Sequence, residues 1–400
     1  MAVSVDIALA LSDNIGPQAG ISRVSLQALS NEFSDIHSSF MEARSAQLIP
    51  FGNVDLQLVD EIVKIFEEHD GRIIFMGENG VISAYQSHID NLDIDFIATP
   101  SPESIPTLEN LERSILVVFD GPLWVRELAA VLCTNVAQTL LCIGDGTFAQ
   151  DDEPWSLPNT TTITALGIAD ARFAPFSPLG LALMVVQDIE LDSIVALMER
   201  IDARCSREGL IENPAYLLAG LFAVFEREQE SLRPAIVFPD ERWRSWSSWA
   251  SSVWAGISSH LWNQNGIRRR TGGNVAVLML SDECRLQHIS VAPRENIAVL
   301  FSSNVPSQVS PNEVTKTAWR LHNNLLDAFL DFMVWDNRPV CQIMIDSNSV
   351  LNRFELSYLW VHSALALGAF LAENPLEMSG SDRWRKISSD VIMNSSNNNQ

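Results

Sequence analysis

The chain has 400 residues, with 26 Lys and Arg against 50 Asp and Glu, which gives a formal net charge of −24. Hydrophobic residues make up 47% and charged residues 19%, a composition typical of globular proteins with large apolar cores. The length predicts two or three domains. Because nucleic acids and anionic membranes are polyanions, the negative charge argues against both as partners.

The first half of the chain has the pattern of an α/β domain. The opening stretch, 1–47, is mostly polar and predicts helix, and 54–69 carries apolar residues at helical spacing. A short apolar strand is predicted at 72–76, followed by the turn Gly77-Glu78-Asn79-Gly80 and a helix at 81–89. A strand, a glycine turn and a helix in succession form the repeating unit of a parallel α/β sheet.

The same unit recurs along the chain. In the first half the pattern predicts strands at 114–119, 139–143 and 161–168 and a helix at 125–135. In the second half it predicts helices at 193–207, 213–229, 243–259, 317–334 and 353–372 and strands at 235–238, 275–280, 297–301 and 340–345. In the helix at 243–259, the tryptophans at 243, 246, 249 and 254 fall near one face. This spacing favours a role of these side chains in packing over a functional one.

The predicted fold class is therefore α/β, with two tandem doubly wound domains whose parallel sheets are flanked by helices. The expected boundaries are an N-terminal helical extension (1–50), a first domain (51–190), a second domain (191–372), and a C-terminal segment (373–400) with a disordered tail.

The cysteines and the apolar stretches favour a reduced, cytoplasmic protein. The five cysteines contain no CxxC pair and predict reduced core thiols. The N-terminus has no basic residue before its short apolar stretch, so it lacks the layout of a secretory signal. The uncharged stretch 356–372 is shorter than the ~20 strongly apolar residues of a membrane span and predicts a buried helix.

Five short motifs resemble, in order, stretches of the phosphoglucose isomerase family. The motifs are DARFAPFSPLGL at 170–181, NPAYLL at 213–218, Pro239 with the Trp-rich stretch 243–255, LQH at 286–288 and GAFLAENP at 368–375. The resemblance covers roughly residues 50–390. It implies the double sugar-isomerase (SIS) fold. It also implies the interconversion of glucose 6-phosphate and fructose 6-phosphate through an enediol, with no cofactor, no metal and a homodimer whose active sites draw residues from both subunits.

The resemblance also implies catalytic roles for three residues. Arg172 aligns with the family's active-site arginine beside the enediolate; the alternative is a structural arginine paired with a carboxylate. His288 aligns with the family's ring-opening histidine; the alternative is a satisfied interior histidine. Near the C-terminus, Arg385 falls in the register of the family's lysine, with Lys386 one residue on, so Lys386 is expected to be catalytic and Arg385 to bind substrate.

The remaining substrate-binding residues are expected in the glycine turns after two strands. They are Gly77, Asn79, Gly80 and Gly121. Both turns depart from the family pattern. The family's hydroxyl-rich phosphate loop is replaced at 119–124 by Phe-Asp-Gly-Pro-Leu-Trp, and Glu78 and Asp120 add negative charge near the phosphate path.

The catalytic base departs from the pattern as well. The family's base is a glutamate, and the same register here holds Gly256. A positioned general base is worth about 10²–10⁴ in rate. His260 or Glu283 could substitute, but only their proximity in sequence supports them. Two functions stay open: a cytoplasmic glucose-6-phosphate isomerase, or an inactive isomerase-fold protein that acts as a sugar-phosphate sensor or as the partner of a sugar-phosphate enzyme.

Overall fold

The computed structural model divides into two compact units, and each is described by itself. The structure describes residues 3–16, 20–52, 54–90, 92–101, 111–144, 157, 160–229, 234–237, 245–246, 249–250, 253, 297–303, 339–345 and 349–371. It also describes scattered positions between 324 and 335. One unit contains a five-stranded sheet and comprises 40–202, 248–256 and 377–400. The other contains a four-stranded sheet and comprises 1–39, 203–247 and 257–376.

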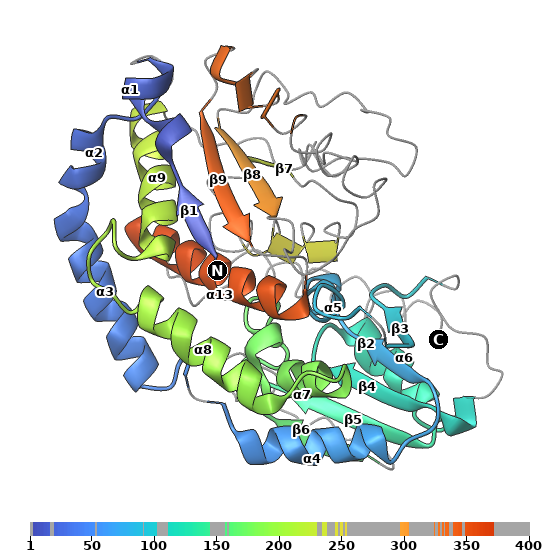
Figure 1. Cartoon of the computed structure of the whole chain (residues 1–400). Coiled ribbons are helices and arrows are strands. Elements are labelled where there is room, and N and C mark those ends of the chain that lie inside the picture. The colour runs from blue at the N-terminus through green and yellow to red at the C-terminus, as the bar shows by residue number, and fades with distance from the viewer. Residues whose placement is uncertain are drawn as a thin grey trace, which may run out of the picture. The chain divides into compact units, whose positions relative to one another are not determined.

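In the five-stranded unit all described strands are parallel, in the order β3-β2-β4-β5-β6 (Figure 1). The strands are β2 (Ile73–Met76), β3 (Ile94–Ile97), β4 (Ile115–Phe119), β5 (Gln138–Ile143) and β6 (Thr160–Thr164). The central strand β4 reads Ile-Leu-Val-Val-Phe and is buried at every position. A continuous apolar run of this kind is expected where helices cover both faces of a parallel sheet.

Alternate residues of these strands meet different helices on the two faces of the sheet. On one face, Met76 and Val118 join a core cluster with Val125 and Leu132 of α6 (Leu123–Leu132). On the other face, Tyr85 of α5 (Asn79–Gln86) stacks on Phe119, with ring centroids 4.8 Å apart. The two helices therefore cover opposite faces, as in a doubly wound sheet.

Other helices of this unit begin at capping side chains. Asp55 caps α4 (Leu56–Glu67) by accepting the backbone N–H groups of Gln57 and Leu58. Ser177 caps α7 (Pro178–Val186) by accepting the N–H of Gly180, with a proline at the first helical position. The remaining elements are the 3₁₀ turns η3 (Leu111–Arg113) and η4 (Ala174–Phe176), with α3 (Ser30–Ser45) and α8 (Leu191–Cys205), whose residues fall in both units.

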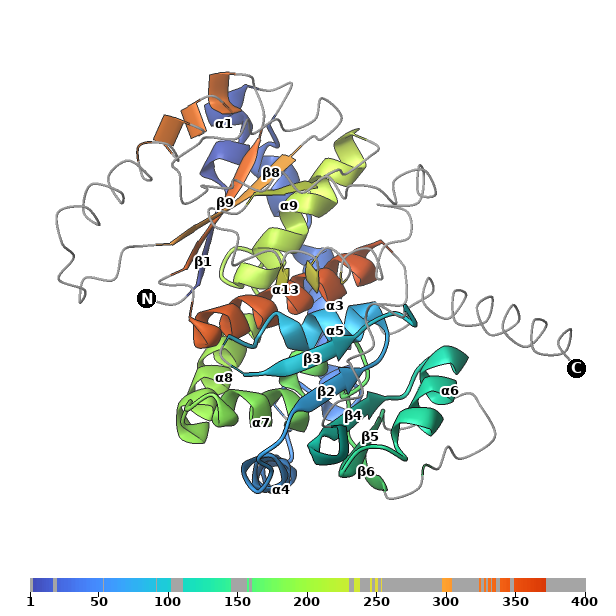
Figure 2. The same cartoon turned by 90° about the vertical axis from the view of Figure 1, so that its right-hand side faces the viewer.

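The four-stranded unit has the order β1-β9-β8-β7 (Figure 1), and Figure 2 shows β1, β9 and β8 from the side. Its strands are β1 (Ser4–Asp6), β7 (Pro234–Val237), β8 (Ile297–Ser303) and β9 (Val340–Ile345). Its helices are η1 (Ala8–Ala10), α1 (Ser12–Ile15), α2 (Arg23–Ala28), α9 (Pro214–Gln229) and α13 (Val350–Phe370). Strands β7, β8 and β9 are parallel, while β1 runs antiparallel to β9.

The first residues of the chain do not form the helical extension expected for 1–50. Ser4 pairs with Met344, so β1 is an edge strand of the sheet built from the C-terminal half. A buried carboxylate fixes this strand. Glu355 of α13 accepts the backbone N–H of Val3 at 3.2 Å and a guanidinium N–H of Arg204 at 3.1 Å. The domain boundary expected at residue 50 therefore does not account for the pairing of β1 with β9. This pairing joins distant parts of the chain, so the local sequence does not indicate it.

Helix α13 is the core helix of the four-stranded unit. It is buried from Arg353 to Gly368 and packs along α9. Ser357 on this helix accepts the indole N–H of Trp246 at 2.8 Å, and the buried His362 ring lies edge-on to Tyr216. The described part of the uncharged stretch 356–372 thus forms the expected helix, which ends at Phe370 and is buried up to Gly368. In the part of the chain that the structure describes, no helix combines the length and the apolarity needed to cross a bilayer.

Most predicted elements that fall on described residues are confirmed, with shifts of a few residues at their ends. The helix α7 and the strands β1 and β3 are missing from the sequence-based prediction. The predicted strand at 275–280 and the C-terminal tail lie outside the described residues. Most residues of the helices predicted at 243–259 and 317–334 also lie outside them.

Candidate functional site

The topology of the five-stranded sheet points to one location for a ligand. After β2 the chain passes through α5 to β3 on one side, and after β4 it passes through α6 to β5 on the other. The connections therefore diverge between β2 and β4. In open α/β sheets, ligands bind in the crevice at the carboxyl ends of the strands where such a divergence occurs. We call the two loops that follow β2 and β4, residues 77–80 and 120–124, the switch-point loops.

The four predicted turn residues Gly77, Asn79, Gly80 and Gly121 all lie in the switch-point loops. Their packing explains two of the glycines. A Cβ on Gly77 would lie 3.0 Å from the Cβ of Phe119, and one on Gly80 would lie 3.2 Å from the Cβ of Ala171. The loops also approach each other, since a Cβ on Gly121 would lie 3.7 Å from the Cγ of Glu78. The structure thus brings the predicted turn residues to one edge of the sheet.

Two carboxylates occupy this edge. Glu78 is the residue before α5, and its side chain makes no capping hydrogen bond to the helix. Asp120 directly follows β4 and forms an ion pair with Arg126 of α6 at 3.2 Å. Phosphate sites at helix starts use backbone N–H groups and positive charge. The switch-point loops instead place negative charge at the start of both helices, which disfavours a phosphate there.

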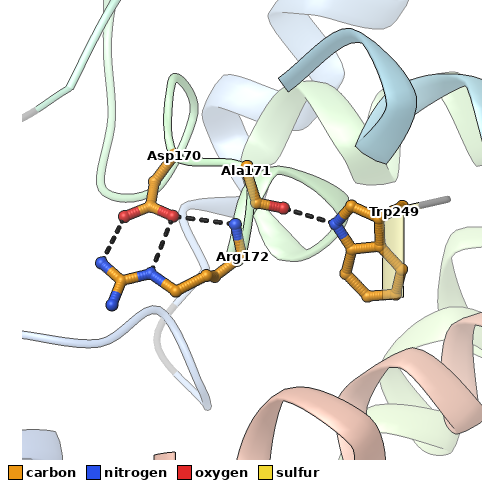
Figure 3. A network of polar contacts seen from close by, with 4 residues as sticks. All are labelled: Asp170, Ala171, Arg172 and Trp249. Carbon is orange, nitrogen blue, oxygen red and sulfur yellow. Dashed lines mark hydrogen bonds and ion pairs between the residues drawn. The ribbon is translucent and has the colours of Figure 1, made fainter. Parts of the chain in front are cut away.

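Arg172 lies in the loop between β6 and η4 and is fully buried. Its Nε donates to Oδ1 of Asp170 at 3.1 Å and its Nη2 to Oδ2 at 2.7 Å (Figure 3). The backbone N–H of Arg172 also donates to Oδ1 at 2.8 Å. Of the two interpretations of Arg172, the structure therefore favours a structural arginine paired with a carboxylate. The catalytic role remains a prediction.

Trp249 fixes the same loop from a distant part of the sequence. Its indole N–H donates to the carbonyl oxygen of Ala171 at 2.5 Å (Figure 3), and its ring packs edge-on to His88. Trp249 is fully buried, which confirms the packing interpretation of this tryptophan. The loop that holds Asp170 and Arg172 is therefore held by its own ion pair and by this indole.

Replacing Trp249 with phenylalanine is expected to lower the free energy of unfolding by about 1–3 kcal/mol, because the buried Ala171 carbonyl loses its donor. Urea denaturation followed by circular dichroism measures this loss. The matched control is Trp124→Phe on α6, whose indole makes no hydrogen bond to a described residue. An equal loss in both variants would show that the Trp249 N–H contributes nothing specific.

A buried tyrosine completes the support of this loop. The hydroxyl of Tyr85 donates to the carbonyl of Ile168 at 2.7 Å and lies 3.1 Å from the Ser177 hydroxyl. Burial raises the pKa of Tyr85 well above its usual value, with a further contribution from Cys142. The phenol therefore stays protonated near neutral pH and acts as a hydrogen-bond donor.

The four described cysteines are buried and form no disulfide with one another, which agrees with the expected core positions of these thiols, while Cys284 lies outside the described residues. Burial raises the pKa of the Cys142 and Cys341 thiols. Because the thiolate is the reactive form, these two cysteines are poor nucleophiles.

Several predicted site residues lie outside the described residues. These are His288, Arg385, Lys386 and Gly256. Among the residues that the structure does describe, no group of three or more His, Cys, Asp or Glu side chains could hold a metal ion.

Sequence reasoning found the turn glycines and both switch-point carboxylates, but it named no partner for Arg172. The signal was present in the motif itself, since an Asp two residues before another residue often accepts that residue's backbone N–H. The bond from Trp249 to Ala171 has no comparable signal, because the two residues are far apart in sequence.

No family model matches the sequence, and no curated protein matches it either. Solved structures are similar to it in fold. A hypothetical protein from Thermus thermophilus superposes with a TM-score of 0.70 at 12% identity, covering 98% of this chain and 99% of the other. A glucose-6-phosphate isomerase from Chlamydia trachomatis superposes with a TM-score of 0.63 at 14% identity, covering 85% of this chain and 73% of the other. The chain therefore shares the α/β fold of these two proteins.

Proposed function

We propose that the chain is a divergent member of the glucose-6-phosphate isomerase family that keeps the fold without the isomerase activity. It acts as a binding protein for a sugar that it recognises through uncharged hydroxyl groups. The observation that carries this proposal is the Asp170–Arg172 pair. The carboxylate of Asp170 binds the guanidinium of Arg172, which is the positive group that isomerisation would need.

The chemistry of isomerisation supports this proposal. Proton transfer between adjacent carbons requires a general base and a positive group where the enediolate oxygen develops. The register of the base holds Gly256, and the positive charge of Arg172 is compensated by Asp170. Each of these changes weakens the stabilisation of the transition state.

The switch-point loops support the loss of phosphate binding. Each charge-assisted hydrogen bond to a phosphate contributes about 1.5–3 kcal/mol. Residues 119–124 contain no side-chain hydroxyl, so three or four such bonds are missing and the affinity would fall by several orders of magnitude. Glu78 and Asp120 are instead hydrogen-bond acceptors, which suit the hydroxyl groups of an unphosphorylated sugar.

A second candidate is the active isomerase itself. It is favoured by the place of Arg172 at the carboxyl edge of the sheet and by the match of Leu286-Gln287-His288 to the family's histidine motif. This candidate requires that another residue has replaced the missing base. For either candidate we propose a cytoplasmic homodimer, as the resemblance implies, and light scattering of the purified chain would measure the oligomeric state.

The two candidates differ in an isomerase assay. The purified full chain is incubated with fructose 6-phosphate, and the glucose 6-phosphate formed is measured by a coupled dehydrogenase. We expect no turnover above a blank without protein, because base and phosphate loop are both missing. Calorimetry should then show weaker binding of glucose 6-phosphate than of glucose.

The matched control in this assay is His288→Ala. Turnover by the wild-type chain that the substitution abolishes would establish the isomerase and contradict the proposal. Turnover that is equal in both proteins would come from a contaminating enzyme.

A further inference from the structure

The Asp170–Arg172 pair has the geometry of an occupied anion site. Two nitrogens of the guanidinium, Nε and Nη2, donate to the two oxygens of one carboxylate at 3.1 and 2.7 Å. This two-pronged arrangement is the one by which arginine binds carboxylate and phosphate ligands. The side chain of Arg172 is 0% exposed and that of Asp170 is 11% exposed, so the pair is shielded from water.

The pair lies close to the first turn of α5. Ala171 lies between the two residues and packs against Gly80, where a Cβ would be only 3.2 Å from the Cβ of Ala171. Gly80 is in the first turn of α5, which begins at Asn79. The start of a helix carries partial positive charge from its unpaired N–H groups. Because the carboxylate of Glu78 opposes this partial charge, the guanidinium of Arg172 is the group that would attract an anionic ligand if Asp170 were absent.

We propose that Asp170 is a specificity-determining residue. Its carboxylate takes the place of an anionic group on Arg172 and thereby excludes phosphorylated or carboxylated ligands from this edge of the sheet. Asp170 is two residues from Arg172 in the chain, so a free anion must compete with a tethered carboxylate of high effective concentration. The pair carries no net charge, so Arg172 no longer attracts anions and this edge of the sheet favours uncharged ligands.

This inference rests on the proposed function for the nature of the ligand, but it is tested separately. The isomerase assay measures turnover by the wild-type chain, whereas the present test measures anion binding by variants of Asp170. Turnover by the wild type would therefore contradict the proposed function. The role of Asp170 would still be decided by the anion-binding test.

The test compares the melting temperatures of three full-length proteins in phosphate and in chloride at equal ionic strength. Asp170→Ala removes the charge and leaves space for an anion. Asp170→Asn removes the same charge but keeps the shape of the side chain, so it is the matched control. We expect inorganic phosphate, at ten times its Kd for the variant, to raise the melting temperature of Asp170→Ala by about 3 °C. The wild type and Asp170→Asn should respond by less than about a third of this value.

An equal response to phosphate in all three proteins would overturn the proposal. If Asp170→Ala does not fold in chloride, the readout is its folding in phosphate. Cooperative melting that phosphate restores would support an anion site on Arg172. If phosphate restores nothing while the double variant Asp170→Ala with Arg172→Met folds in both buffers, phosphate does not replace the carboxylate and the proposal fails.

Discussion

Replacing Arg172 with methionine is expected to lower the free energy of unfolding by about 3–5 kcal/mol. The substitution keeps an apolar stem of similar length but leaves the carboxylate of Asp170, which is 11% exposed, without its guanidinium. Breaking one side of a buried ion pair costs much more than the pair itself contributes. Urea denaturation of the purified chain, with the midpoint and slope compared to wild type, measures the loss.

The control for this prediction is the double variant Asp170→Asn with Arg172→Met. Because it removes both charges, it should recover most of the stability that Arg172→Met loses. With the single variant Asp170→Asn measured as well, the double-mutant cycle gives the coupling energy of the pair. A loss below about 1 kcal/mol in Arg172→Met would contradict a buried pair and would fit two solvated side chains instead.

The elements that the sequence predicts best are those whose burial is uniform. The strand β4 and the helix α13 are buried along nearly their whole length, so their apolar runs are long and continuous. The strand β3 was missed because it is an edge strand and contains Asp95, whose carboxylate forms an ion pair with Arg72. The strand β1 was missed because its pairing, Ser4 with Met344, spans almost the whole chain.

The candidate site shows the same division between local and long-range information. The turn glycines were predictable because Gly77, Gly80 and Gly121 lie within four residues after a strand, and the carboxyl ends of parallel strands share one edge. The pairing of Arg172 was not decided by the sequence, since its motif permits both a catalytic and a structural side chain. The choice depends on which carboxylate the guanidinium meets, and only the fold decides that.

These findings separate the fold from its chemistry. A TM-score of 0.63 to a glucose-6-phosphate isomerase at 14% identity shows that the fold tolerates extensive change in sequence. The core requires apolar side chains of suitable volume, which many sequences provide. Isomerisation requires particular groups at particular positions, and the sequence resemblance predicts that Gly256 stands in the register of the family's glutamate base. The shared fold is therefore a weak argument for shared activity.

A loss of stability as large as that of Arg172→Met is expected for Phe75→Ala, also in the five-stranded unit. Phe75 is fully buried on β2, and its ring contacts three others edge-on, with centroids 5.6 Å from Tyr85, 6.0 Å from Phe96 and 5.5 Å from Phe119. Removing it leaves a cavity among these rings and should lower the free energy of unfolding by about 3–5 kcal/mol. Calorimetric melting of the purified variant measures this loss.

The matched control for Phe75→Ala is Phe75→Leu, which fills most of the same volume and should lose only about 1–2 kcal/mol. The two variants also test how the core supports the switch-point loops. Phe119 contacts both Phe75 and Tyr85 and directly precedes Asp120, so a cavity at Phe75 loosens the end of β4. The sugar binding that we propose should therefore weaken in Phe75→Ala and persist in Phe75→Leu. Equal stability of the two variants would mean that the ring cluster does not hold this edge of the sheet.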